Sequence, residues 1–124
     1  MKGFGRENKS NEKKENEKDL KILKEKIINQ AFSYHSQGNI IEASKYYKDF
    51  IDQGFLDHRV YSNLGVILKE QGKLNEAEIL IRKAIKHSPG YANAYSNLGN
   101  LLQDQGKIQE AVDSYRKAID IDPK

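Results

Sequence analysis

Three asparagine side chains recur at one fixed spacing along the chain. Asn29, Asn63 and Asn97 are separated by 34 residues each. A carboxamide carries both hydrogen-bond donors and an acceptor, so it can pair with a peptide unit whatever side chain that unit bears. The chemistry available to such a row is the binding of a polypeptide backbone, without any covalent step.

Other residue types that could do chemistry lack the spacing that the chemistry needs. His35, His58 and His87 form no His-x3-His or His-Glu-x-x-His pattern, so we expect no metal site. Cysteine is absent, which excludes a thiolate zinc site and a cysteine nucleophile. No serine stands in a Gly-x-Ser-x-Gly elbow. We therefore predict that the chain is not an enzyme and carries no cofactor.

The composition indicates an elongated rather than a compact fold. Of the 124 residues, 37% are hydrophobic and 31% are charged, with a mean hydropathy of −0.82. This suits an array in which each unit buries one stripe against its neighbours. There is no signal-peptide core and no run near the ~18 apolar residues of a membrane span. We expect a cytoplasmic protein, and its net charge of +3, made of mixed signs, does not indicate nucleic acid.

The asparagine spacing belongs to an internal repeat of 34 residues. The sequence Tyr61-Ser-Asn-Leu-Gly65 recurs as Tyr95-Ser-Asn-Leu-Gly99. Between 58–90 and 92–124, 16 of 33 aligned positions are identical. A degenerate copy precedes them and matches the next copy at 6 of 34 positions. The repeat, more than any single motif, sets the architecture.

The repeats delimit the domains. We place them at about 24–57, 58–91 and 92–124, within a repeat domain that spans 20–124. Residues 1–19 mix both charge signs without an apolar period, so we expect a disordered tail. The first helix would then begin near Leu20, with Asp19 as its N-cap.

Each repeat reads as two helices joined by a tight turn. In the second repeat the apolar residues fall on one helical face, at Val60, Leu64, Ile67 and Leu68. Gly72 and Gly106 stand where the first helix of each pair should stop. Pro89 and Pro123 follow the second helices, where a residue without an N–H discourages continuation. The predicted fold class is all-α.

Small residues hold fixed phases within each helix pair. Gly65 and Gly99 occupy one phase of the first helix, and Ala77 and Ala111 occupy one phase of the second. Side chains this small let two antiparallel helices approach closely, so we expect overpacking if they are enlarged.

This pattern resembles the tetratricopeptide repeat. The matching phases are an aromatic residue (Tyr61, Tyr95), a Leu-Gly pair, an alanine (Ala77, Ala111) and a proline (Pro89, Pro123), and the resemblance covers about 24–124. It implies a right-handed α-solenoid of about three helix-turn-helix repeats. In that family the concave groove, lined mainly by the first helix of each pair, usually binds a peptide or extended segment.

The same resemblance suggests which residues contact a partner. The phase of Asn29, Asn63 and Asn97 tends to face the groove, and the row looks like the asparagine ladder in the repeat arm of protein O-linked N-acetylglucosamine transferases. That ladder hydrogen-bonds the partner's backbone. The alternative is that asparagine is merely tolerated at this partly exposed phase. Further candidate contacts are Arg59, His35, Lys69, Glu70, Asn100, Gln103 and Asp104.

A second binding mode in the family is not expected here. The carboxylate clamp of chaperone-binding members combines groove asparagines with several cations. Glu25, Asn93 and Asn97 stand where those cations would be needed, and only Arg59 could serve.

The sequence thus predicts a non-catalytic adaptor whose groove binds an extended segment of a protein or peptide partner. One alternative is a substrate-recruiting arm of, or partner to, a glycosyl-, methyl- or sulfotransferase. Another is a scaffold that self-associates through the C-terminal repeat, where Ile108, Tyr115 and Ile119 have no following helix in this sequence to cover them.

Overall fold

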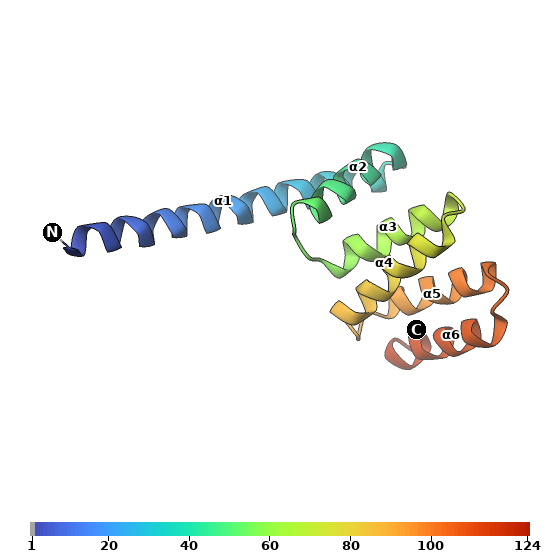
Figure 1. The fold of residues 1–124 in the computed structure, drawn as a ribbon. Helices are drawn as coiled ribbons and strands as arrows, with labels where there is room; N and C mark the ends of the chain where they lie inside the picture. Colours follow the sequence, from blue (N-terminus) through green and yellow to red (C-terminus); the bar gives the residue numbers. More distant parts are fainter. Residues whose placement is uncertain (1) are drawn as a thin grey trace. The chain divides into compact units, whose positions relative to one another are not determined.

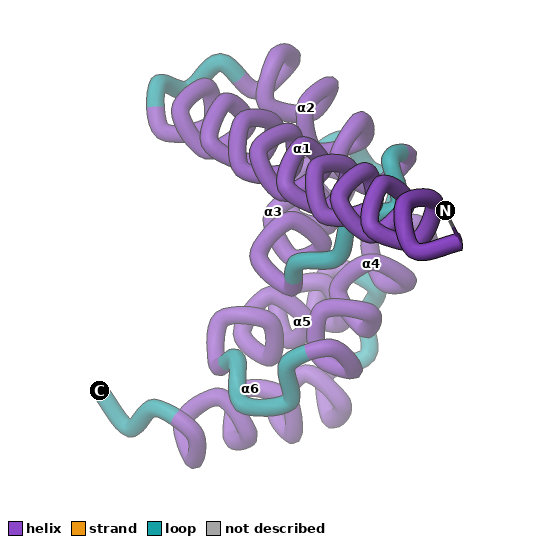
Figure 2. The backbone as a smooth tube through the Cα atoms, turned by 90° about the vertical axis from the view of Figure 1, so that its left-hand side faces the viewer, coloured by secondary structure: helices purple, strands orange, loops and turns teal. Residues whose placement is uncertain are grey.

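The computed structural model describes residues 2–124, with side chains from Asn8 onward. The described chain contains six helices and no strand: α1 (Lys2–Ser36), α2 (Ile40–Asp52), α3 (His58–Glu70), α4 (Leu74–His87), α5 (Ala92–Asp104) and α6 (Ile108–Ile121) (Figure 1). Short turns separate consecutive helices (Figure 2). The prediction of an all-α repeat fold is confirmed. The chain forms two units, Met1–Tyr46 and Tyr47–Lys124, which we describe separately as unit 1 and unit 2.

Unit 2 contains the last turns of α2 and two helix hairpins, α3–α4 and α5–α6. The predicted turns are confirmed, because Gly72 and Gly106 take φ values of +80° and +79°, which a side chain would disfavour. Helix α5 packs on both helices of the preceding hairpin. This arrangement places α3 and α5, the first helices of the two hairpins, beside each other.

Close approach within each hairpin depends on the small residues. A Cβ atom on Gly65 would lie 2.6 Å from Cγ1 of Ile81, and a Cβ on Gly99 would lie 2.6 Å from Cε1 of Tyr115. Ala77 and Ala111, on the second helices of the same hairpins, are buried, and the carbonyl oxygen of Ala77 would lie 3.3 Å from the added Cβ at Gly65. The close approach predicted at Gly65 and Gly99 is therefore confirmed, and the overpacking expected on enlarging Ala77 or Ala111 stays a prediction.

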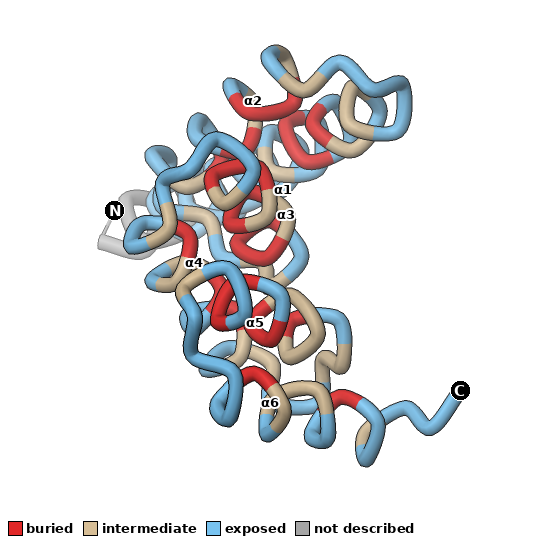
Figure 3. The backbone as a smooth tube through the Cα atoms, turned by 90° about the vertical axis from the view of Figure 1, so that its right-hand side faces the viewer, coloured by how far each residue is buried: buried red, intermediate tan, exposed pale blue. Residues whose placement is uncertain are grey.

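A shared core joins the two hairpins. Tyr61, Ala84 and Ala94 form one buried cluster, and Ile51 and Tyr91 pack against it. Buried positions line most of α3, whereas α6 shows only isolated ones, at Ala111 and Ala118 (Figure 3). In unit 2, α3 is therefore largely buried, whereas most residues of α6 are at least partly exposed.

Unit 1 consists of α1 and the first turns of α2. Ile27, Ala31 and Ala43 are buried, and the rings of Tyr34 and Tyr46 stack with centroids 5.5 Å apart. The degenerate first repeat therefore forms the helix pair that its spacing indicates.

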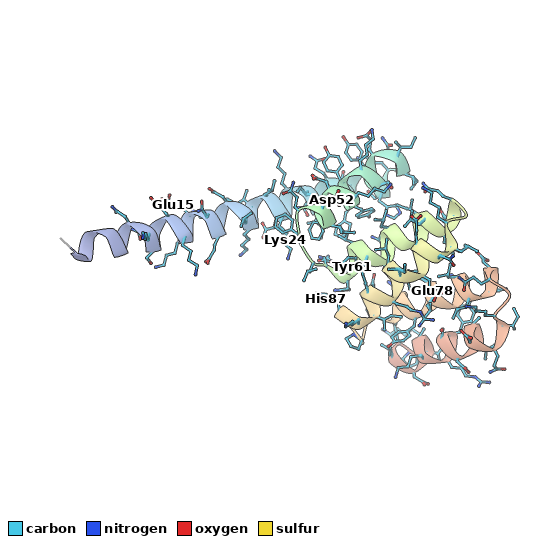
Figure 4. All side chains as sticks on the ribbon, in the orientation of Figure 1. Glu15, Lys24, Asp52, Tyr61, Glu78 and His87 are labelled. Atoms are coloured by element: carbon cyan, nitrogen blue, oxygen red, sulfur yellow. The ribbon has the colours of Figure 1, made fainter. Side chains whose placement is uncertain are left out.

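The N-terminal segment differs from the expectation. Helix α1 already begins at Lys2, where we expected disorder through residue 19, so Asp19 lies inside the helix and is not its N-cap. Lysine and glutamate favour helix, which explains the extension. Every described side chain from Asn8 to Leu23 is exposed, as around Glu15 in Figure 4. Only local propensity therefore supports these turns.

Candidate functional site

The candidate site consists of the predicted polar residues on two neighbouring helices of unit 2, α3 and α5. We call it the α3/α5 face and define it by the predicted residues that lie on these two helices, Arg59, Asn63, Lys69, Asn97, Asn100 and Gln103. All six lie on α3 or α5, and these two helices contact each other. The other two predicted residues, Asn29 and His35, lie on α1 in unit 1.

Asn63 and Asn97 both point one amide hydrogen into the protein. Nδ2 of Asn97 donates to Oγ of Ser62 at 2.8 Å, and Ser62 has no exposed surface. Nδ2 of Asn63 donates to Oη of Tyr47 at 3.1 Å. Each carboxamide thus links the first helix of its repeat to the preceding repeat, because Ser62 lies on α3 and Tyr47 on α2.

The carbonyl oxygens of both carboxamides have no hydrogen-bond partner among the described residues. Neither Oδ1 is fully buried. Among the described residues, the buried side-chain atom without a hydrogen-bond partner is Oε1 of Gln105, and an enclosed Oδ1 of Asn63 or Asn97 would have belonged to the same group. An amide held at one end and open at the other is a pre-oriented acceptor for a backbone N–H.

The phenol that anchors Asn63 is set in the core. Tyr47 is fully buried, and burial raises the pKa of its hydroxyl, although the hydrogen bond from Asn63 acts in the opposite direction. The hydroxyl therefore stays protonated well above neutral pH, and its oxygen remains a stable partner for the carboxamide.

The charged residues of the face are paired. Nη2 of Arg59 lies 2.8 Å from Oδ2 of Asp57, whose Oδ1 also caps α3 by accepting from the Arg59 backbone N–H. Burial acts to raise the pKa of Asp57, but the hydrogen bonds from Arg59 outweigh it and hold that pKa below its usual value. Nζ of Lys69 lies 3.8 Å from Oδ2 of Asp104, which bridges α3 and α5.

Two polar residues of α5 are held by α6. Oη of Tyr115 donates to Oδ1 of Asn100 and lies 3.2 Å from Oε1 of Gln103. Both side chains are exposed, and their amide NH2 groups donate no hydrogen bond to a described residue. The α5 part of the face therefore offers the amide NH2 groups of Asn100 and Gln103 as donors and Oδ1 of Asn97 as an acceptor.

The two candidates on α1 have their own surroundings. Asn29 lines a polar hollow of about 320 Å³ with Lys26, Gln30 and Ser33. His35 is half-buried near the end of the same helix. Glu70, which the sequence also proposed, is exposed at the C-terminus of α3.

Sequence reasoning missed the intramolecular partners of the asparagines. Tyr47, Ser62 and Tyr115 were assigned to packing or not singled out, yet each binds a residue of the face. One signal was available, because Ser62 recurs as Ser96 directly before the repeated asparagine. It also missed an apolar hollow of about 370 Å³ on unit 2, lined chiefly by Ile51, Leu64, Leu68, Ile79 and Leu80.

Neither a metal-binding cluster nor a membrane-spanning helix is present among the described residues. No group of three or more His, Cys, Asp or Glu side chains there could hold a metal ion. No helix in that part of the chain combines the length and apolarity needed to cross a membrane.

Solved structures show the same fold. The crystal structure of MamA is similar, with 26% identity and a TM-score of 0.72 over 86% of this chain, which spans 64% of the MamA chain. A Thermobaculum terrenum O-GlcNAc transferase matches at 22% identity and a TM-score of 0.76, covering 82% of this chain and 19% of that one. The second repeat domain of Spaghetti, bound to the HSP90 peptide SRMEEVD, matches at 18% identity and a TM-score of 0.79, covering 92% and 99%.

Sequence comparison agrees with the structural one. No curated protein sequence matches the chain significantly. The family model for the tetratricopeptide repeat matches residues 56–124, which is more than half of the 124 residues. The chain belongs to the tetratricopeptide repeat family.

Proposed function

We propose that the chain is a protein-interaction module whose α3/α5 face binds an extended segment of a partner protein. The observation that carries this proposal is the geometry of Asn63 and Asn97. Each is fixed from inside by one hydrogen bond and keeps an Oδ1 that is not fully buried and has no partner among the described residues. Acceptors held in advance lose little freedom when a backbone N–H binds them, so affinity does not depend on the partner's side chains.

The paired charges argue for a backbone-directed rather than a charge-directed mode. Arg59 is bound by Asp57 and Lys69 by Asp104, so capturing an acidic terminus would first break an existing ion pair. Specificity then comes from the exposed amides of Asn100 and Gln103. We expect the HSP90 peptide SRMEEVD, which the Spaghetti domain binds, to bind this chain weakly or not at all.

One alternative has a specific observation in its favour. The chain resembles a segment that makes up 19% of an O-GlcNAc transferase chain. The asparagines of this chain recur every 34 residues, which is the pattern that suggested a transferase repeat arm. In that case the α3/α5 face would recruit the substrate of a transferase. Both functions use the same surface, and they differ in whether the bound partner is then modified by an enzyme. The cytoplasmic location stays a prediction.

The test is quantitative capture of partners from a lysate with three baits. The first is the parent chain, and the second carries Asn63→Ala and Asn97→Ala. The third carries Tyr47→Phe and Ser62→Ala, which removes the same two internal hydrogen bonds but keeps both carboxamides. Circular dichroism and urea unfolding verify that the two variants are equally folded.

We expect partners that bind the parent, are lost from the second bait and bind the third bait more weakly than the parent, because the third bait keeps both carboxamides but no longer holds them in place. Equal capture by all three baits would remove the asparagines from the binding surface. Undiminished capture by the third bait would show that the internal hydrogen bonds do not contribute to binding by pre-orienting the carboxamides. A transferase or its substrates among the captured proteins would favour the recruiting arm.

A further inference from the structure

The apolar hollow of about 370 Å³ lies between consecutive helices of unit 2, away from both termini of the chain. Its lining residues come from the last turns of α2, from α3, and from the start of α4 with the turn before it. The apolar ones are Ile51, Leu64, Leu68, Ile79 and Leu80. The hollow shares no residue with the α3/α5 face, so its role is independent of the proposed function.

The repeat architecture does not require an apolar surface at this place. Ile79 is 58% exposed, and the residues at the same phase of the neighbouring repeats, 34 positions earlier and later, are Lys45 and Asp113. Both of these charged residues are exposed, as is typical of a solvated helix surface. Leu80, which also lines the hollow, is replaced by Ser114 one repeat later. The second repeat therefore carries apolar residues where the next repeat has polar ones, which is typical of a binding surface.

Four charged side chains also line the hollow. Lys48 and Asp52 belong to α2, whereas Lys73 and Glu76 lie where α4 begins. All four are exposed, and none forms an ion pair with a described residue. Arg82, the counterpart of Lys48 one repeat later, is instead bound by a glutamate whose Oε2 lies 3.0 Å from its Nε. The charges of the hollow are therefore available to a binding partner.

The arrangement of these charges restricts what can bind. Lys48 and Asp52 are four residues apart, and Lys73 and Glu76 are three residues apart, so each side presents a cation and an anion about one helical turn apart. A binder with charges of one sign would be repelled by two of the four groups. An uncharged molecule would leave all four without a partner. A helix that carries opposite charges one turn apart on both flanks complements all four.

We propose that the apolar hollow binds an amphipathic helix of a partner protein. The helix places large apolar side chains against Ile51, Ile79 and Leu80, and burial of these surfaces supplies affinity. On each flank it carries an acidic and a basic residue. One flank pairs with the charges of α2 and the other with the charges at the start of α4, which fixes the orientation of the helix.

The test begins with a library of helical peptides displayed on phage, in which apolar, acidic, basic and polar residues are varied. The library is selected on the full chain after depletion on the Ile79→Ser variant. This variant removes the apolar contact and should keep the fold, because Ile79 is largely exposed. We expect enriched peptides that combine an apolar face with both acidic and basic residues on its flanks, and circular dichroism verifies that they are helical.

Fluorescence anisotropy with one enriched peptide then measures the apolar contact. Ile79→Ser should weaken binding to the full chain about tenfold. The matched control is Ile108→Ser, because Ile108 is also 58% exposed and does not line the hollow. The control should bind as the parent does, and equal loss in both variants would place the peptide outside the hollow.

A pair of charge exchanges tests the complementarity. Lys48→Asp combined with Asp52→Lys leaves the net charge unchanged and should weaken binding about fivefold. Arg116→Asp combined with Asp120→Arg is the control, because these exposed residues of α6 have the same order and spacing but lie outside the hollow. A peptide with the acidic and basic residues of one flank exchanged should bind the Lys48/Asp52 variant better than it binds the parent.

The following results would overturn the proposal. One is a selection that enriches no peptide after the depletion step. Another is the enrichment of peptides that are uncharged or carry charges of only one sign. A third is equal binding by the parent and by the Lys48/Asp52 variant. The last comes from light scattering of the chain alone: a dimer that Ile79→Ser dissociates and Ile108→Ser does not would make a second copy the occupant.

Discussion

Gly65 and Gly99 lie inside α3 and α5, where glycine is less favourable than alanine by about 1 kcal/mol. Both positions are explained by the neighbouring helix of the same hairpin. An added Cβ at Gly65 would meet Ile81 at 2.6 Å and the carbonyl oxygen of Ala77 at 3.3 Å, and that backbone oxygen cannot rotate away. Helix propensity is given up here so that two helices can touch.

This packing makes Gly65→Ala a sensitive substitution. We expect it to lower the free energy of unfolding by about 1–3 kcal/mol, because overpacking outweighs the gain in propensity. Gly90→Ala is the control, since no atom lies within 4 Å of a Cβ there and its φ is not positive. Urea unfolding of both variants measures the difference, and equal midpoints would contradict the close-packing role.

Asp57 gives a pH-dependent prediction at the same scale. Its pKa is lower in the folded protein than its usual value of 3.8, so its charged form stabilises the fold above that pH. The contribution is lost as the pH falls below 3.8 towards the folded-state pKa. Asp57→Asn keeps a capping side chain but removes the charge. The parent should therefore be more stable than this variant at pH 7, with a difference that shrinks as the pH drops below 4.

Two further variants separate the cap from the charge. Asp57→Ala removes the cap as well and should lower stability by about 0.5–2 kcal/mol at pH 7. Asp120→Asn removes an exposed carboxylate on α6 that makes no hydrogen bond with the described residues, and it is the matched control in the same measurements. A constant difference between parent and Asp57→Asn from pH 7 to pH 3 would exclude the proposed linkage.

At the scale of helices, the first helices of neighbouring repeats are tied together by side chains. The bond from Asn97 to Ser62 and the ion pair of Lys69 with Asp104 both join α3 to α5. Asn97 therefore connects neighbouring repeats on its donor side, and in the proposed function its acceptor side binds a partner.

A double-mutant cycle tests the structural half of this role. Ser62→Ala and Asn97→Ala should each lower the free energy of unfolding, and the pair should show a coupling of about 0.5–1.5 kcal/mol. Asn93→Ala combined with Ser62→Ala is the control, because Asn93 lies one turn earlier on α5 and bonds Tyr91 instead. A coupling near zero for the Ser62–Asn97 pair would leave the asparagine without an inter-repeat role.

The helices of the repeats were predictable from the sequence, and their side-chain partners were not. Periodicity and the glycines Gly72 and Gly106 predict helix ends in α3 and α5 that the structure confirms. A helical phase shows which face a residue occupies, but not whether its side chain reaches the next helix, so the bond from Asn97 to Ser62 was missed. The start of α1 was also missed, because its charged residues have helix propensity without any packing pattern to reveal it.

At the scale of the whole molecule, a repeat is stable only when neighbours cover its faces. In unit 2 the last turns of α2 supply one cover through Tyr47 and Phe50, which are both fully buried. The opposite end, at α6, has no comparable cover among the described residues. The stability of the two hairpins should therefore depend strongly on the cover that is present.

Two truncated chains test this dependence. A fragment of residues 56–124 keeps both hairpins but loses Tyr47 and Phe50, each a buried ring whose removal costs about 3–5 kcal/mol. We expect its urea midpoint, followed by circular dichroism, to fall to near zero. A chain of residues 20–124 is the control; it loses only exposed described side chains and should unfold at the parent midpoint. If the shorter fragment kept the parent midpoint, the two hairpins would form an autonomous domain, and the cover from α2 would not be needed for stability.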